Sequence, residues 1–355
     1  MAVFDKSGRP LTGYTDVWTR NASGAAVHPA HLYGKNKQEL SFSSSLSGIR
    51  WVAFGDSLTD DTGACRDGAP NKYHKLIADG TGAAVVVKGL GGTGYWKTQD
   101  AGTCFSQRMA ASAADSAVDI VTIFGSVNDH TVYWGGGYGS DNYYLKAGAA
   151  ESGGYVSFDA LGNTTAPSDA EIASGIAQLS LDDRNPQSGT KTFVGYVNDC
   201  IDAAHEKYPN AKVVLVHEIA FYNTKAGQLK KERAIREAIV TKRRASGDGW
   251  LYLFKLNECR FEGLDDSERK YLNTVANAGL SFDSGQLEDS VFRGYYTYDG
   301  AGHPNDRYNR LWLGPVFAAL LCDVLGISRA GLPSSLSVGS YDTGGLWIGV
   351  GGEED

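Results

Sequence analysis

The sequence predicts an α/β fold in which a parallel sheet is covered by helices on both faces. From about residue 50 onward, short apolar runs alternate with amphipathic stretches of helical length. Several of the apolar runs lead directly into Gly, Asn or Asp, which are the residues of tight turns. With 42% of its 355 residues hydrophobic, the chain can bury a sizeable core. Alternating strands and helices favour a parallel sheet between two helical layers.

The elements are expected in a regular order. Residues 1–47 are polar and rich in turns, which predicts an N-terminal arm or small β extension ahead of a main domain over residues 48–328. Within that domain we expect strands at residues 51–55, 84–87, 120–125, 212–217 and 250–256. Helices are expected at residues 72–78, 192–207, 229–244 and 306–325.

Two segments lie outside this alternation. A Gly- and Tyr-rich insert at about 130–190 is too long for a structureless loop in a compact domain, so we expect a lid or subdomain. It contains Tyr133 and Trp134, whose flat rings suit stacking on sugars, although packing within the insert explains them equally well. Residues 329–355 form a C-terminal tail in which apolar and small residues alternate, typical of an extra strand or a contact surface.

The charge balance excludes some partners. A net charge of −8 and a pI of about 5.4 argue against nucleic acid, which needs clustered Lys and Arg. One basic cluster is interleaved with Glu232 and Glu237, and its spacing predicts the solvated face of a helix; it comprises Lys230, Lys231, Arg233, Arg236, Lys242, Arg243 and Arg244. His74 and His205 fall in amphipathic helices and are expected at the surface.

Targeting signals and metal motifs are not recognisable in the sequence. The first 15 residues lack a signal-peptide pattern, and the longest apolar run is too short to span a membrane. We therefore expect a soluble protein without membrane insertion. Its expected location is the cytoplasm or a phage particle, and its expected assembly is a homo-oligomer or part of a virion. The five scattered cysteines form no CxxC pair, so no structural zinc site is expected; reduced thiols are the default, with a Cys65–Cys104 pair as the alternative.

The most informative segment is Gly55-Asp56-Ser57-Leu58-Thr59-Asp60, which directly follows the apolar run at residues 51–54. An apolar strand that ends in Gly-Asp-Ser places a serine hydroxyl at the carboxyl edge of a sheet, where open α/β folds bind ligands. A serine becomes a nucleophile only when a base takes its proton, and the oxyanion that forms needs hydrogen-bond donors. A base and several donors are therefore expected at other strand ends.

The first donor is expected in the glycine-rich string that follows residues 84–87. Glycine lets the backbone approach a substrate closely, because it has no Cβ. The same string contains Gly89, Gly91 and Gly94 in the Gly-x-Gly-x-x-Gly spacing of dinucleotide-binding folds. That alternative, a nicotinamide-dependent oxidoreductase, requires a helix at once, and residues 95–102 are a poor helix start.

The second donor and the base follow later strands. Asn128 lies in Gly125-Ser126-Val127-Asn128-Asp129, after the strand at residues 120–125. Its amide is a neutral donor, although an Asn-Asp pair that simply closes a strand is the alternative. His303 lies in Tyr298-Asp299-Gly300-Ala301-Gly302-His303-Pro304-Asn305. Its side chain titrates near neutral pH, as a general base must.

These four motifs, in this order, resemble those of the GDSL hydrolases, also called the SGNH esterase/lipase superfamily. The resemblance covers residues 51 to about 325 and implies a three-layer α/β fold with a parallel sheet of about five strands. It also implies Ser57 as nucleophile, His303 as base, and Gly92 and Asn128 as oxyanion donors, with Gly91 and Gly94 as rivals of Gly92. The family ends in Asp-x-x-His, whereas this chain has one extra residue between Asp299 and His303.

The extra residue leaves two arrangements open. The glycines before His303 let the loop bulge so that Asp299 orients the imidazole, or a backbone carbonyl orients it and a Ser-His dyad remains. Asp56, Tyr133, Trp134 and His217 are expected to contact the substrate. The resemblance implies a serine esterase that needs no metal or organic cofactor, and we favour a small acyl group such as acetyl on a carbohydrate or polysaccharide. The alternatives are a glycan-binding scaffold with little turnover, and a lipase or thioesterase.

Overall fold

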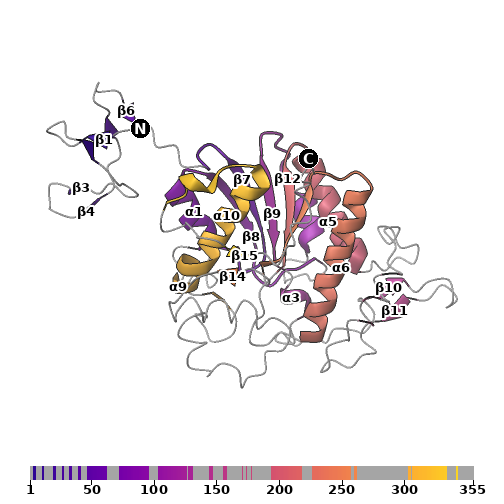
Figure 1. Cartoon of the computed structure of the whole chain (residues 1–355). Coiled ribbons are helices and arrows are strands. Elements are labelled where there is room, and N and C mark those ends of the chain that lie inside the picture. Colours follow the sequence, from indigo (N-terminus) through magenta and orange to yellow (C-terminus); the bar gives the residue numbers. More distant parts are fainter. Residues whose placement is uncertain are drawn as a thin grey trace, which may run out of the picture.

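The computed structural model describes residues 46–61, 72–95, 103–125, 127–130, 193–217, 226–256, 303–304 and 306–333, with short helix and strand segments elsewhere. Its centre is a five-stranded sheet in the order β8-β7-β9-β12-β13, and every neighbouring pair is parallel. This confirms the predicted fold class (Figure 1). The strands are β7 (Arg50–Gly55), β8 (Ala84–Gly89), β9 (Ile120–Phe124), β12 (Lys212–Val216) and β13 (Leu251–Phe254).

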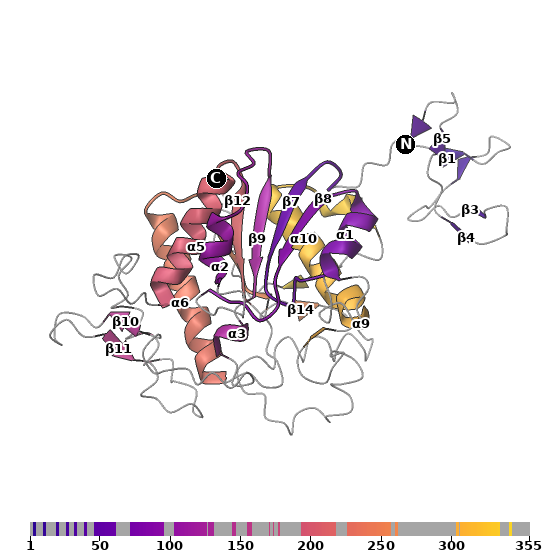
Figure 2. The same ribbon diagram turned by 180° about the vertical axis from the view of Figure 1, so that it is seen from behind.

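The side chains of these strands alternate between two separate cores. In β7, Trp51 and Ala53 belong to one buried cluster, whereas Val52 and Phe54 belong to the other. Successive residues of a strand point to opposite faces of a sheet, so each face receives its own layer of helices. α1 (Tyr73–Thr81) and α10 (Gly314–Leu325) cover the first face, and α2 (Phe105–Ala110), α5 (Phe193–Lys207) and α6 (Ala226–Ala245) cover the second, as Figures 1 and 2 show.

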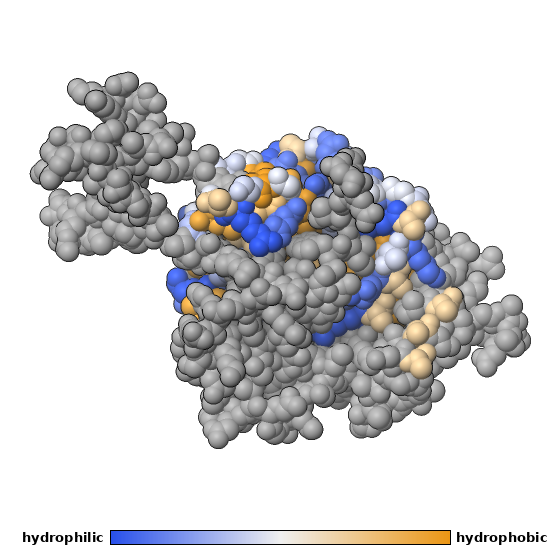
Figure 3. Space-filling model, in the orientation of Figure 1, coloured by the Kyte–Doolittle hydropathy of each residue, from blue (hydrophilic) through white to orange (hydrophobic). Residues whose placement is uncertain are grey.

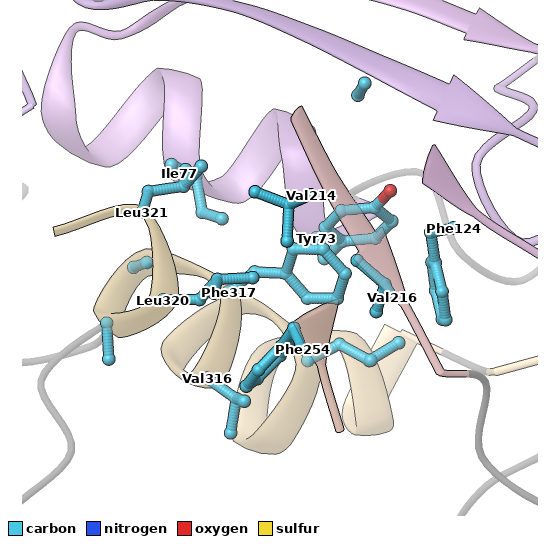
Figure 4. Packing of buried hydrophobic residues seen from close by; sticks show 14 of the residues in the cluster. Tyr73, Ile77, Phe124, Val214, Val216, Phe254, Val316, Phe317, Leu320 and Leu321 are labelled. Carbon is cyan, nitrogen blue, oxygen red and sulfur yellow. The ribbon is translucent and has the colours of Figure 1, made fainter. Parts of the chain in front are cut away.

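Aromatic rings fill the first core where α1 and α10 meet the sheet. Tyr73 of α1 lies against Phe317 of α10, with ring centroids 4.3 Å apart. Phe317 also contacts Phe124 at 5.3 Å and Phe254 at 6.1 Å, so it joins the helical layer to two strands (Figure 4). Rings at these separations contribute beyond the area they bury. This packing fixes the first turn of α1 relative to the carboxyl ends of β9 and β13.

The last helical segment differs from the single helix predicted for residues 306–325. It begins as α9 (Asp306–Tyr308), continues as a π-helical turn at Asn309–Leu313 and ends as α10. Pro315 is the physical reason for the change. Proline has no backbone N–H and its ring crowds the carbonyl four residues earlier, so a continuous α-helix is disrupted in the turn before it. A π-helical turn directly before Pro315 accommodates it.

Short elements complete the structure outside the central sheet. In the predicted N-terminal arm, three antiparallel pairs of strands follow one another: β1 (Val3–Phe4) with β2 (Pro10–Leu11), β3 (Thr19–Arg20) with β4 (Ala26–Val27), and β5 (Leu32–Tyr33) with β6 (Glu39–Leu40). In the insert, β10 (Tyr144–Lys146) pairs with β11 (Tyr155–Ser157). In the predicted tail, β15 (Tyr341–Asp342) pairs with β14 (Arg260–Phe261). A short helix, α3 (Val127–His130), follows β9, and a 3-10 turn spans Arg329–Gly331.

Three arginines of the basic cluster on α6 do not lie on the solvated face that the charge spacing predicts. Glu232, Arg233, Arg236 and Arg243 are all 5% exposed or less. Arg243 pairs with Asp202 at 2.7 Å and with Asp248 at 2.6 Å, so partners on other segments compensate its burial. For these arginines the prediction was wrong because charge periodicity along one helix carries no information about charged residues on other segments.

The surface of the described part is mixed. Figure 3 shows hydrophilic and hydrophobic side chains interspersed over the coloured part of that view. Within the described ranges, no helix is long and apolar enough to cross a membrane. The described cysteines Cys104, Cys200 and Cys322 are buried free thiols, so a Cys65–Cys104 disulfide is not formed.

Candidate active site

The strand ends that precede the predicted site residues are in register. Gly55 of β7 pairs with Gly89 of β8 on one side and with Phe124 of β9 on the other. The segments that follow these three residues therefore leave the sheet at one level of the same edge. They are the serine turn (residues 56–60), the glycine turn (residues 90–95) and α3. The chain order reverses between β7 and β9, and ligands bind at such a switch point in open α/β sheets.

The serine turn is held by its own first residue. Asp56 is fully buried; its Oδ1 accepts a hydrogen bond from Leu58 N at 2.9 Å, and its carbonyl accepts from Thr59 N and Asp60 N at 3.1 and 2.9 Å. A peptide whose carbonyl accepts hydrogen bonds is polarised, and its N–H becomes a better donor. That N–H belongs to Ser57. The serine itself is 6% exposed, so it lies just below the surface.

The glycines of the second segment have different structural reasons. Gly92 has a φ of 73°, a left-handed conformation that glycine adopts without strain. Gly89 and Gly94 are instead places of close approach. A Cβ on Gly89 would lie 2.1 Å from Asp60 N, and a Cβ on Gly94 would lie 2.3 Å from the carboxylate of Asp129. The turn backbone at Gly92 is thus the one that requires glycine for its conformation.

Residues 90–95 form a turn rather than the start of a helix. A dinucleotide-binding fingerprint places a helix N-terminus directly within its glycine string, so that the pyrophosphate meets free N–H groups. The described residues of the glycine turn lack that helix. Packing against the serine turn and α3 explains the glycines at positions 89 and 94, and residues 90–95 do not support the dinucleotide-binding interpretation.

Three aspartates join the segments to one another. Asp60 Oδ2 accepts from Gly91 N at 2.9 Å, and Asp129 Oδ2 accepts from Tyr95 N at 2.8 Å. Asp56, Asp60 and Asp129 are each 5% exposed or less, so these carboxylates act as buried acceptors. Hydrogen bonds from backbone N–H groups to ionised carboxylates are stronger than neutral ones. The glycine turn is thus fixed at both ends, once by the serine turn and once by α3.

Asn128 connects all three segments through its amide. Its Nδ2 donates to Thr93 O at 2.9 Å and, over a longer 3.4 Å, to Asp56 Oδ2. The side chain is 7% exposed, which places it beside Asp56 and below the surface. At the start of this segment, Gly125 has a φ of 153°, and a Cβ there would lie 2.7 Å from Asp56 Cγ. The structure therefore brings Asn128 into contact with the residue that precedes Ser57.

Two arginines that the sequence does not place at the site complete the network. Arg108 of α2 donates to Gly55 O at 3.1 Å, to Thr93 Oγ1 at 2.9 Å and to Lys88 O at 2.5 Å. Its guanidinium lies 4.6 Å from the centre of the Phe54 ring. Burial lowers the pKa of Arg108, while the nearby carboxylates oppose that shift. Arg236 of α6 donates to Gly125 O at 3.3 Å. Neither residue belongs to a motif, and no sequence signal marks them.

Of the remaining predicted site residues, the structure describes two histidines and does not describe the other three. His303 is half-buried and precedes the buried Pro304. His217 follows β12 at the same edge, and its backbone N–H donates to Phe254 O at 2.8 Å; its ring is buried. Asp299, Tyr133 and Trp134 lie outside the described residues, so their roles stay predictions. Within the described ranges, no group of three His, Cys, Asp or Glu side chains is arranged to hold a metal ion.

His74 is buried, which corrects the surface position predicted for it. It is 1% exposed, and its Nε2 lies 3.0 Å from Thr59 O of the serine turn. Since Thr59 O can only accept, Nε2 carries the hydrogen and Nδ1 is unprotonated. Burial lowers the pKa of His74 to about 4, from 6.5 in the unfolded chain. His205 is half-buried and stacks on Trp250, with ring centroids 3.9 Å apart.

This burial predicts acid sensitivity. Between pH 6.5 and pH 4 the unfolded chain binds a proton at His74 that the folded chain does not, so stability falls as pH falls. The free energy of unfolding should decrease by about 3 kcal/mol over this window on account of His74. His74→Gln keeps an amide donor for Thr59 O and cannot be protonated, so it should lose about 3 kcal/mol less than the wild type.

Urea unfolding at pH 7 and pH 4 measures the difference. His205→Gln is the control for the loss of a histidine as such, because it lies on α5 away from the serine turn. Equal acid destabilisation of the wild type and His74→Gln would show that another group is responsible.

One protein family and several solved structures are similar to this chain. The model of the GDSL-like lipase/acylhydrolase family matches residues 53–311. A protein described as "a possible lipase" from Chitinophaga pinensis DSM 2588 is 18% identical, with a TM-score of 0.39 over 79% of this chain and 100% of that one. An extracellular lipase from Streptomyces rimosus is 14% identical, with a TM-score of 0.36 over 77% of this chain and 99% of that one. A family two carbohydrate esterase from Clostridium thermocellum is 12% identical, with a TM-score of 0.40 over 79% and 65%. No curated protein matches the sequence.

Proposed function

Since the chain belongs to the GDSL-like lipase/acylhydrolase family, we propose that it is a serine esterase that forms an acyl-enzyme on Ser57. The observation that carries the proposal is the position of Ser57. Ser57 follows β7, one of the two strands between which the chain order reverses. The glycine turn beside it is held by carboxylates of the serine turn and of α3, and Asn128 of α3 contacts Asp56. A nucleophile must be presented rigidly if its attack is to be fast.

The proposed reaction has two steps. His303 Nε2 or Nδ1 accepts the proton of Ser57 Oγ as this oxygen attacks the ester carbonyl carbon, and the resulting imidazolium protonates the leaving alcohol. Water then attacks the acyl-enzyme with His303 again as base, which releases the acid and restores the serine. Asp299, by the family motif, orients the imidazole.

The oxyanion is assigned three donors: the N–H groups of Ser57 and Gly92 and the Nδ2 amide of Asn128. The polarised peptide before Ser57 and the left-handed turn at Gly92 support the backbone pair. Asn128 Nδ2 donates to Thr93 O at 2.9 Å and, over a longer 3.4 Å, to Asp56 Oδ2, so an oxyanion that accepts from this amide replaces the longer of the two bonds. Donors that are in place before the reaction stabilise the charge without reorganisation.

The proposed substrate is a small acyl ester, acetyl in particular, on a carbohydrate. Ser57 is 6% exposed, and a short acyl group reaches such a recessed hydroxyl with less rearrangement than a long chain. The aromatic residues Tyr133 and Trp134 of the insert suit sugar rings, as flat apolar surfaces do. A lipase or thioesterase remains the alternative substrate class within the same mechanism.

A panel of esters tests this proposal. p-Nitrophenyl acetate, butyrate and octanoate are compared with an acetylated polysaccharide, for which acetate release is measured, and Ser57→Ala serves as the blank. We expect kcat/KM to fall with chain length and acetate to be released from the polysaccharide. A preference for octanoate would support a lipase instead. Polysaccharide binding by a wild type that hydrolyses no ester would support the glycan-binding scaffold.

A further inference from the structure

The first turn of α1 holds the serine turn through three consecutive residues. Lys72 is 5% exposed, and its ammonium donates to Ser57 O at 2.6 Å and also to Asp60 O. The Tyr73 hydroxyl lies 3.0 Å from Thr59 Oγ1, and His74 Nε2 donates to Thr59 O. Burial raises the pKa of Tyr73, so its hydroxyl stays protonated. The start of α1 therefore sets where the serine turn lies.

Asn309 connects that same turn of α1 to the segment of the proposed base. Its Oδ1 accepts from Tyr73 N at 3.0 Å, and its Nδ2 donates to Pro304 O at 3.2 Å. The first N–H groups of a helix lack partners within the helix, and the N-cap residue Lys72 makes no side-chain cap. Asn309, more than 230 residues away in sequence, supplies the cap instead.

The backbone of Asn309 is itself fixed. It is the first residue of the π-helical turn, and its carbonyl accepts from Gly314 N. The following helix, α10, packs on α1 through the Tyr73–Phe317 contact shown in Figure 4. π-helical turns inside helices are frequent at functional sites, where they displace one residue from the regular helical path. Here the displaced turn begins at the residue that bridges α1 and Pro304.

We infer that Asn309 is a positioning residue that holds His303 at a set place relative to Ser57, through Pro304 on one side and the start of α1 on the other. The inference rests on the proposed function, since it concerns the base of that reaction. His303 precedes a proline, which restricts its backbone to extended conformations. Fixing the carbonyl of Pro304 therefore constrains the backbone of His303 as well.

Loss of this link should affect turnover more than binding. Asn309→Leu removes both hydrogen bonds at nearly constant volume, so the base segment loses its attachment to α1. Because misplacement of a catalytic group by about 1 Å can cost about a hundredfold, we expect kcat for p-nitrophenyl acetate to fall roughly tenfold to a hundredfold with KM nearly unchanged. The rate at which a fluorophosphonate labels Ser57 should fall in the same proportion, since this reaction also needs the base.

Asn198→Leu is the matched control. Asn198 is a fully buried asparagine of α5, on the opposite face of the sheet, and its Oδ1 accepts from Arg243 at 3.3 Å. A purely structural effect of removing a buried amide should appear equally in both variants. We expect Asn198→Leu to keep kcat and the labelling rate within about threefold of the wild type, on the rule that distant sites act independently.

Asn309→Asp is the second variant, in case Asn309→Leu does not fold. It keeps the acceptor for Tyr73 N and loses only the donor to Pro304 O, so kcat should fall here too. If the two Asn309 variants match Asn198→Leu in kcat and labelling rate, the inference is wrong although the proposed function stands. If the wild type is neither hydrolytic nor labelled, or Ser57→Ala is labelled equally, the proposed function itself fails.

Discussion

Replacing Ser57 by alanine will lower kcat/KM for p-nitrophenyl acetate by about ten-thousandfold or more, the scale on which serine hydrolases lose activity without their nucleophile. The reason is that Ser57 Oγ forms the covalent bond to the acyl group, and no other hydroxyl of the serine turn has the same position. Thr59, the nearest alternative, is fully buried and its Oγ1 lies 3.0 Å from the Tyr73 hydroxyl. Initial rates with wild type and Ser57→Ala at equal concentration measure the effect.

The variant should fold normally, which separates chemistry from stability. The Ser57 side chain makes no hydrogen bond among the described residues. Its backbone carbonyl accepts from Lys72, and the substitution does not change that bond. We expect the free energy of unfolding to change by less than about 1 kcal/mol. His303→Ala should show a similar loss of activity with unchanged folding. Full activity in a folded Ser57→Ala protein would rule out Ser57 as the nucleophile.

Gly89→Ala will strongly destabilise the protein, because the added methyl group would meet the backbone of the serine turn. The new Cβ would lie 2.1 Å from Asp60 N, 2.4 Å from Asp60 Cα and 2.5 Å from Thr59 C. All three are backbone atoms, which cannot rotate away as the end of a side chain can. We expect the free energy of unfolding to fall by about 3 kcal/mol or more, at the upper end of overpacking effects. Urea unfolding measures the change.

Gly249→Ala is the control for the same chemical change. An added Cβ at Gly249 meets no atom within 4 Å, and its backbone is not left-handed, so its stability should stay within about 0.5 kcal/mol of the wild type. Gly89→Ala should also reduce the activity of the folded fraction, because the serine turn must move away from β8. Equal stability of the two variants would mean that the serine turn and β8 are not in the contact described here.

Much of the fold was predictable from local patterns. The five strands were expected within two residues of their observed bounds, because each is a short apolar run. β8 extends to Gly89, two residues beyond the prediction, since Lys88 and Gly89 still pair with Phe54 and Gly55. α2 was missed: a six-residue helix has too few turns to show a periodic pattern. The π-helical turn was missed because its cause, Pro315, is also common in the first turn of a regular helix.

The candidate site was predictable only as separate motifs. Ser57 and Asn128 could be identified because each follows a strand in a recognisable string, and Gly92 by resemblance to the family. The bonds that join these strings could not be predicted. Asp60 meets Gly91 and Asp129 meets Tyr95 across more than 30 residues of sequence, and Arg108 and Arg236 reach the site from helices without any motif. Such contacts depend on the strand order, which periodicity does not reveal.

Burial of charge was the least predictable property. The helical spacing of His74 and of the arginines of α6 predicts surface positions for them. The structure instead buries His74, Arg233, Arg236 and Arg243. A buried charge needs partners, and these come from other elements: Asp202 and Asp248 for Arg243, and Gly125 O for Arg236. Of these buried groups, His74 and Arg236 contact the edge of the sheet that carries the site, whereas Arg243 pairs with Asp248 just before β13, at the opposite edge.

The measurement that tests the central claim most directly is the mass of the protein after reaction with a fluorophosphonate, followed by peptide mapping. The account predicts one adduct per chain, located on Ser57, with loss of ester hydrolysis in proportion to labelling and no adduct in Ser57→Ala. An unlabelled but folded and hydrolytic wild type, or an adduct on any other residue, would contradict it.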